Sequence, residues 1–438
     1  MAAPDPQDLL RPLGHWARSL RIGDVPGPAL HAARAQLAHI QGRVPVAAAT
    51  LDLPASNAKD ASLYGAFDGD GHILGARTGV GLATLRSVNA ADLTVERLLL
   101  ACVIGAEIGA RIGLATLLGD RATSSSARPG AAAGAAAIAW LGGADGEGIA
   151  RAVGAAVGLA ATGGAHGAAF GALVAEAAMG GAQATGSDPS LALGLWAGVA
   201  DPIPGALAVD GRWLSSALVL PELCVPAALA TAIEAVHEIL LRHVRAAEKR
   251  LRADQIERIE LRVPFATWAA DQAEPRLAEL VGRLVAFHAL GPLERHGTAT
   301  LSEGIRVDKS ADIAAVASRV EITHDYALSV GLVRSAVPYT GPLSLSRYRA
   351  LRRTLPTAHL PDLLAALRAR PDRLFRAVSA EVVAPLAFPV QVKLYTSRGG
   401  WWPERRSVAN GALDVESPLP APFDAPLDAA AGPLLGAT

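Results

Sequence analysis

A glycine-rich segment gathers groups that suit acid-base chemistry, because Asp68, Asp70, His72 and Arg77 occur within ten residues. Glycine permits tight backbone turns, which can bring a carboxylate, an imidazole and a guanidinium together. The same composition is also typical of a solvated surface turn. We expect Asp70 and His72 to be catalytic, and Asp68 and Arg77 to bind substrate.

Three further polar residues are candidates for the site: two are isolated, and Ser124 lies in a cluster of Ser residues. Glu176 is the one carboxylate between residues 152 and 187, and His166 is isolated among Ala and Gly. Burial raises the pKa of a carboxyl group and suits it to acid-base work, whereas a helix end facing water is an equally good setting for Glu176. A lone His is more often a core residue, and a Ser cluster more often a polar helix entry. We expect Glu176 to be catalytic, and His166 and Ser124 to bind substrate.

The tripeptide His324-Asp325-Tyr326 forms a polar cluster between a strand-like segment and an apolar one. Residues 318 to 322 have the pattern of a strand, and residues 327 to 333 form an apolar run. Adjacent helical residues point in different directions, so at most two of the three side chains can share a pocket. We expect Tyr326 to be catalytic.

The sequence completes no metal or nucleotide motif. Asp68 begins a segment like a calcium loop, but Gly79 occupies the twelfth position, where a bidentate Glu is needed. His237 and His243 are two residues too far apart for a zincin pair, and we expect both to be exposed on a helix. Neither nucleotide-binding glycine motif occurs. We therefore expect neither metal nor cofactor.

The elements that must position these residues are mostly helices in the first half of the chain. Thr94 and Glu96-Arg97 predict the start of a helix that runs through Arg111. Residues 129 to 141 and 146 to 179 predict further helices, and the second carries glycines at four-residue spacing. That spacing lets helix backbones approach closely.

After Arg250 the pattern changes from helical to mixed. Residues 256 to 263 alternate apolar and charged side chains, which is the period of a half-buried strand. Residues 390 to 395, followed by Arg398-Gly399-Gly400, predict a strand and a turn. We predict a mainly α fold, with a large helical domain over residues 1–254 and a smaller α+β domain over residues 255–400.

Composition excludes several functional classes. The 438 residues are 51% hydrophobic but only 4% aromatic, which indicates closely packed helices with small side chains. A net charge of -1 argues against a nucleic acid partner. Residues 152–175 are long enough to cross a membrane but consist mostly of Ala and Gly, so we expect buried helices and no membrane. Two cysteines, Cys102 and Cys224, and no signal-like start predict buried thiols and a cytoplasmic location.

The order of several segments resembles the MmgE/PrpD family, which contains 2-methylcitrate dehydratase, cis-aconitate decarboxylase and iminodisuccinate epimerase. Residues 95 to 113 are similar to its E-L-L-x-A-x-x-x-G-Y-E-x-x-x-R-L-G helix. The other segments that carry the resemblance are residues 16–42, 67–85, 195–214, 256–263 and 326–328. It implies a helical domain completed by a tail, residues 401–438, an α+β lid, an active site in the cleft between them, and a homodimer.

The basic residues of the family's motifs are missing from the matching positions. They are replaced by Ala122 to Ser126 for G-F-H-P-T, Glu176 to Gly180 for K-x-x-H, Cys224 to Ala228 for C-R-Y-x-H, and Glu321 for the lysine of K-F-S. A site for di- or tricarboxylates needs cations to offset buried anionic charge. The resemblance therefore implies the scaffold more strongly than the family's chemistry.

We expect a repurposed enzyme that cyclises or isomerises a mainly apolar, natural-product-like small molecule without a cofactor. Shape, desolvation and one or two hydrogen-bond donors can lower such a barrier. In this hypothesis His72 or Tyr326 polarises a carbonyl, and Glu176 or Asp70 takes any proton that moves. The alternatives are a dehydratase, decarboxylase or epimerase of a small carboxylic acid, and a non-catalytic scaffold or partner subunit.

Overall fold

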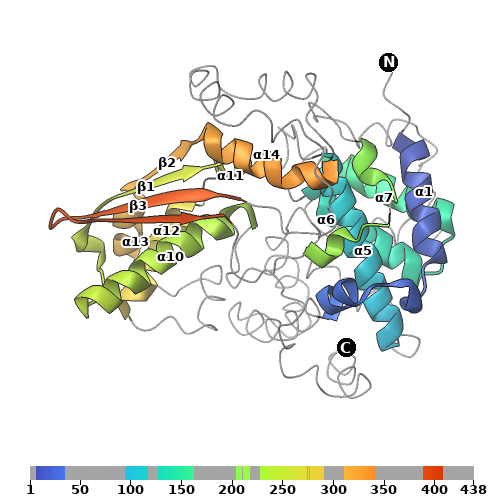
Figure 1. Ribbon diagram of the computed structural model, residues 1–438, viewed down its shortest axis with the longest axis horizontal. Helices are drawn as coiled ribbons and strands as arrows, with labels where there is room; N and C mark the ends of the chain where they lie inside the picture. The colour runs from blue at the N-terminus through green and yellow to red at the C-terminus, as the bar shows by residue number, and fades with distance from the viewer. Residues whose placement is uncertain are drawn as a thin grey trace.

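The computed structural model describes residues 6–34, 94–116, 127–161, 204–209, 211–217, 227–273, 275, 277–290, 310–340 and 388–407. This part of the chain is mostly helical with one small mixed sheet, which confirms the mainly α class. Figure 1 shows a group of helices at one end, the sheet with its covering helices at the other, and α14 (Tyr326–Thr340) reaching from the sheet to the helices.

The helical group consists of α1 (Pro6–Ser19), α5 (Val95–Ala115), α6 (Ala127–Leu141) and α7 (Gly146–Ala161). Thr94 begins α5 as predicted, because its side chain accepts a hydrogen bond from the Arg97 N–H at 3.2 Å. Small residues set the helix spacing: a Cβ atom on Gly109 would lie 2.8 Å from the Pro129 carbonyl oxygen. The short 3-10 helices near this group are Ile22–Asp24, η3 (Pro204–Leu207) and η4 (Leu214–Ala217).

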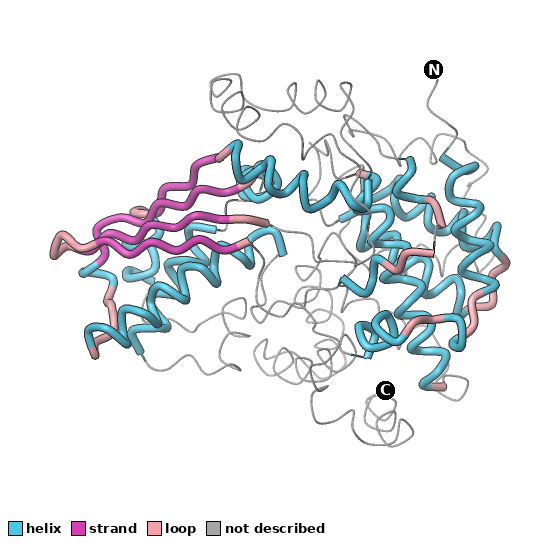
Figure 2. Tube along the Cα trace, in the orientation of Figure 1, coloured by secondary structure: helices cyan, strands magenta, loops and turns pink. Residues whose placement is uncertain are grey.

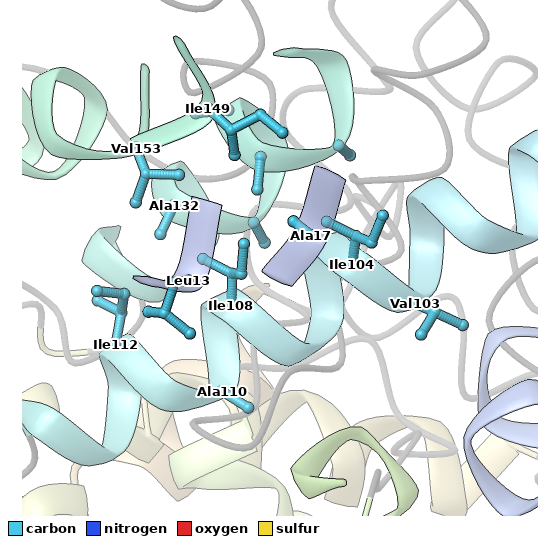
Figure 3. Packing of buried hydrophobic residues seen from close by; sticks show 14 of the residues in the cluster. Leu13, Ala17, Val103, Ile104, Ile108, Ala110, Ile112, Ala132, Ile149 and Val153 are labelled. Carbon is cyan, nitrogen blue, oxygen red and sulfur yellow. The ribbon is translucent and has the colours of Figure 1, made fainter. Parts of the chain in front are cut away.

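The core of the helical group is built from aliphatic side chains of modest size. Figure 3 shows Leu13 and Ala17 of α1 packed between Ile104 and Ile108 of α5 and Ile149 of α7. Cys102 is fully buried there, and this burial raises the pKa of its thiol to about 12. That prediction of a buried thiol is confirmed, whereas Cys224 lies outside the described residues.

A buried ion pair on α5 binds the backbone of residues 208–215, which are distant in sequence. Glu107 and Arg111 lie 2.9 Å apart at 0% and 3% exposure. The Glu107 carboxylate accepts hydrogen bonds from the backbone N–H groups of Leu214 at 3.1 Å and Ser215 at 2.9 Å. Arg111 donates to the carbonyl oxygens of Ala208 and Arg212. Both charges are therefore paired and hydrogen-bonded, as buried charges must be.

The sheet has the strand order β2-β1-β3-β4, formed by β1 (Ile256–Val263), β2 (Val320–His324), β3 (Val390–Thr396) and β4 (Trp401–Arg406). β1 pairs in parallel with β2 and antiparallel with β3, and Figure 2 shows β3 and β4 joined as a hairpin. The hairpin turn contains Gly399 at a φ of +81°, a conformation that favours glycine. The predicted strands at 256–263 and 390–395 are confirmed.

One face of the sheet is covered by α10 (Ala227–Ala247), α12 (Leu277–Leu290) and α13 (Ser310–Ala317) (Figure 1). Their apolar side chains and those of β1 and β3 form a second core, separate from that of the helical group. The expected limits of 255 and 400 leave α10 and β4 outside this unit, yet both pack into it. The 3-10 helix Ala253–Gln255 leads into β1. The division into domains otherwise stays a prediction.

α14 connects the two groups of elements. It begins beside β1 and α11 (Phe265–Ala273), and farther along it lies against α5 and η3. Leu332 of α14 and Phe388, which precedes β3, belong to the core of the helical group. The helix therefore contacts elements of both groups, and its Leu332 belongs to the core of the helical group.

One described helix, α5, is long and apolar enough to cross a membrane, over residues Glu96–Ala115. The most apolar 18 residues of this stretch are buried inside the protein. Burial of this kind is typical of the core helix of a folded domain.

Candidate functional site

Of the eight residues predicted to form the site, the structure describes Tyr326. The seven others lie outside the described residues: Asp68, Asp70, His72, Arg77, Ser124, His166 and Glu176. The geometry around Tyr326 is therefore the basis of the candidate site.

Tyr326 follows the carboxyl end of β2, next to the carboxyl end of β1. These ends are adjacent because the two strands are parallel, with Val263 in register with His324. β1 leads into α11 through Pro264, and β2 leads into α14 through Asp325. Two helices therefore start side by side at one edge of the sheet.

Asp325 fixes the start of α14. Its N–H donates to the Val263 carbonyl oxygen at 2.9 Å, which ties the residue to β1. Its Oδ1 accepts hydrogen bonds from the N–H groups of Ala327 at 2.8 Å and Leu328 at 3.2 Å. This is the arrangement of an N-cap, which satisfies N–H groups that the first helical turn leaves unpaired.

The Ser329 hydroxyl joins both strand-helix junctions. Its oxygen lies 2.7 Å from Nε2 of His324, and it accepts a hydrogen bond from the Phe265 N–H at 2.8 Å. The Asp325 carbonyl oxygen is also within reach, at 3.2 Å. Because the hydroxyl has one proton, it can donate to His324 or to Asp325 but not to both. Ser329 is buried, so its hydroxyl is shielded from water.

Aromatic rings surround the His324 imidazole. Its ring centroid lies 4.4 Å from that of Tyr326, 6.0 Å from that of Phe265 and 6.3 Å from that of Trp268. Tyr326 is 2% exposed, and His324 is half-buried. Of the polar tripeptide, His324 and Tyr326 thus lie side by side, while Asp325 caps α14.

This cluster provides three kinds of chemistry. An imidazole can accept or donate a proton, a phenol can donate a hydrogen bond to a carbonyl, and the rings provide apolar contact area. A Ser hydroxyl beside an imidazole is also the contact of a nucleophile with its base. Ser329 is buried and bound to backbone groups from two elements, so it is better placed to orient His324 than to attack a substrate.

Ser329, Phe265 and Trp268 were not predicted from the sequence to belong to the site. Phe265 and Ser329 are 64 residues apart, and only the parallel pairing of β1 with β2 brings them together. The sequence feature that could have indicated these contacts is that β1 and β2 each lead directly into a helix.

A second histidine cluster lies between α10 and α12. Burial, together with the smaller effects of nearby His237, Arg250 and His243, lowers the pKa of His288 from 6.5 to about 4. His237 and His243 are half-buried, so the expectation of exposed residues was wrong. Within the part of the chain that the structure describes, no group of three or more His, Cys, Asp or Glu residues could hold a metal ion.

No protein-family model matches the chain, and no curated protein matches its sequence. The resemblance to the MmgE/PrpD family therefore stays a prediction, and the site geometry carries the functional argument.

Proposed function

We propose that this protein is a cofactor-independent enzyme that cyclises or isomerises a mainly apolar, natural-product-like small molecule on an MmgE/PrpD-like scaffold. The observation that carries the proposal is the His324 imidazole, held by Ser329 and surrounded by the rings of Phe265, Trp268 and Tyr326. Such a cluster pairs a group that can move a proton with apolar surface that can bind carbon-rich substrates.

In this proposal His324 accepts a proton from the substrate and returns it at another carbon. Tyr326 donates a hydrogen bond to a substrate carbonyl, and it is one of the two residues, with His72, for which the sequence predicts this role. General acid-base catalysis contributes on the order of 10²- to 10⁴-fold in rate. A hydrogen bond aimed at developing charge is worth more where water is excluded, which suits the buried position of Tyr326.

The position of Glu321 favours this reaction over the family's chemistry. Glu321 stands where the resemblance places the K-F-S lysine, and its side chain is 55% exposed. Glu321 and His324 are three residues apart on β2, and side chains alternate between the faces of a strand. The two side chains therefore project from opposite faces of the sheet. A cation that could bind a carboxylate substrate is therefore replaced by a surface anion.

The remaining expectations are part of the same proposal. The protein is proposed to be a cytoplasmic homodimer that binds a small-molecule substrate and acts without nucleic acid or membrane. Sedimentation equilibrium tests the dimer: a mass of one chain at micromolar concentration would contradict it.

The experiment is to incubate the purified protein with polyene and polyketide-like compounds and with small carboxylic acids, followed by liquid chromatography and mass spectrometry. Cyclisation or isomerisation gives a product of unchanged mass and altered retention, whereas dehydration or decarboxylation removes water or carbon dioxide. We expect the unchanged-mass product, and His324→Gln to reduce its rate about 100-fold. His15→Gln, at an exposed histidine of α1, is the matched control.

A mass loss from a carboxylic acid would support the lyase alternative instead. No turnover of any compound, together with a stable complex with another protein, would support the scaffold alternative.

A further inference from the structure

We propose that the face of the sheet that no described helix covers is a docking surface for an acidic peptide segment of a partner protein. This open face is defined by Arg258, Arg262, Gln391, Lys393, Trp401 and Arg405. It lies opposite α10, α12 and α13, which cover the other face (Figure 1). The inference does not depend on the proposed enzymatic function.

Strand register places the cations of the open face together. Arg262 pairs with Gln391 across β1 and β3, and Gln391 pairs with Arg405 across β3 and β4. Neighbouring strands are about 4.8 Å apart, so the backbones of Arg262 and Arg405 are separated by roughly 10 Å. Lys393 is two residues from Gln391 and therefore on the same face. Three cations thus surround one amide side chain.

The carboxylates of Glu260 and Glu321 on this surface already form ion pairs. Arg258 contacts Glu260 at 2.7 Å and Glu321 at 3.7 Å. Within the described residues, Arg262, Lys393 and Arg405 form no ion pair. Arg262 and Arg405 are exposed to solvent. The patch is therefore positive, although the whole chain has a net charge of -1.

The chemistry of the patch favours carboxylates. A guanidinium presents paired N–H donors that match a carboxylate, and an amide between two of them can donate or accept. Trp401 is 56% exposed at the edge of this patch and offers apolar contact area to a neighbouring peptide side chain. Several carboxylates along one chain would satisfy the separated cations together, which a single small anion would not.

Nucleic acid fits the same face less well. Bases bind such surfaces by stacking on exposed aromatic rings. Here the Arg258 guanidinium lies 4.6 Å from the Tyr395 ring centroid, and the Lys393 ammonium lies 5.6 Å from that of Trp401. A base would have to displace these cations before it could stack.

The test measures binding of a fluorescein-labelled decaglutamate peptide to the full chain by fluorescence anisotropy at low and moderate salt. We expect salt-sensitive binding, weakened at least tenfold in Arg262→Glu/Arg405→Glu and by a smaller factor in Arg262→Gln/Arg405→Gln. The matched control is Arg245→Glu/Arg252→Glu, because these arginines are 66% and 70% exposed and lie outside the open face. Circular dichroism verifies that all variants are folded.

Four results would overturn the proposal. One is no peptide binding by the unmodified chain, and another is equal weakening in the control variant. The third is tighter binding of a ten-nucleotide single strand than of the peptide, which would assign the face to nucleic acid. The fourth is loss of a dimer in Arg262→Glu/Arg405→Glu alone, measured by sedimentation of the same variants. That result would assign the face to a second copy of this chain.

Discussion

The Ser329 hydroxyl oxygen lies 2.7 Å from Nε2 of His324 and 2.8 Å from the backbone nitrogen of Phe265. One buried side chain thereby connects the helix that follows β1 with the helix that follows β2. The position of the imidazole depends on this connection, and so does the local stability of the sheet edge.

Removing that hydroxyl is expected to have two effects. Ser329→Ala leaves the half-buried Phe265 N–H without its acceptor, which costs about 1 kcal/mol in the free energy of unfolding. Ser329→Thr retains the hydroxyl and should recover most of that loss. Urea unfolding of the two variants measures the difference, and equal stability of Ala and Thr would show that the hydroxyl contributes nothing.

The N-cap of α14 gives a second prediction. Asp325→Ala removes the acceptor of the Ala327 and Leu328 N–H groups and should lower the free energy of unfolding by about 1 kcal/mol. Asp325→Asn keeps a capping oxygen and should lose less. Thermal unfolding of both variants is the measurement, and a larger loss for Asn than for Ala would contradict the assigned role.

His288 predicts a dependence of stability on pH. Its pKa is about 4 in the folded chain and 6.5 ordinarily, so the unfolded chain binds the proton more readily. The resulting stability is fully present above pH 6.5 and is lost as the pH falls toward 4, a change on the order of 3 kcal/mol.

His288→Leu tests this prediction. The two ring nitrogens have no hydrogen-bond partner among the described residues, so an apolar side chain of similar size should be tolerated. Unfolding free energies measured from pH 7 to pH 4 should decline less steeply in this variant than in the unmodified chain. His15→Leu, at an exposed histidine, is the control and should leave the slope almost unchanged. An identical slope in His288→Leu would refute the assignment.

The buried pair on α5 should tolerate little change. Arg111→Met leaves the Glu107 carboxylate buried without its cation, and losses of about 3–5 kcal/mol are typical of such a change. Arg97→Met, also on α5 and half-buried, is a control for loss of an arginine. Calorimetric unfolding distinguishes them, and similar losses would mean that the pair has no special role.

Local sequence patterns predicted the strands and helices that have a characteristic residue period or capping residue. The strand at 256–263 is visible as an alternation of apolar and charged residues, regular from Ile259 to Val263, and the start of α5 is marked by a capping Thr94. β4 was missed because Pro403 and three charged residues mask its strand pattern. An amphipathic helix such as α10 indicates that one face is buried, but it does not indicate against which element.

The candidate site depends on contacts that no local pattern carries. Tyr326 was predicted because it belongs to a polar tripeptide beside an apolar run. Ser329, Phe265 and Trp268 join it only because β1 and β2 pair in parallel. The pairing of distant strands depends on the whole core, so a short segment does not contain it.

The most direct test of the proposed function is a thermal-shift panel that compares citrate-like acids with apolar polyene and polyketide-like compounds, since a ligand of the folded state raises its apparent stability. The account predicts stabilisation by apolar compounds, reduced in Trp268→Ala and insensitive to salt. Stabilisation by the citrate-like acids alone, suppressed by salt, would contradict it.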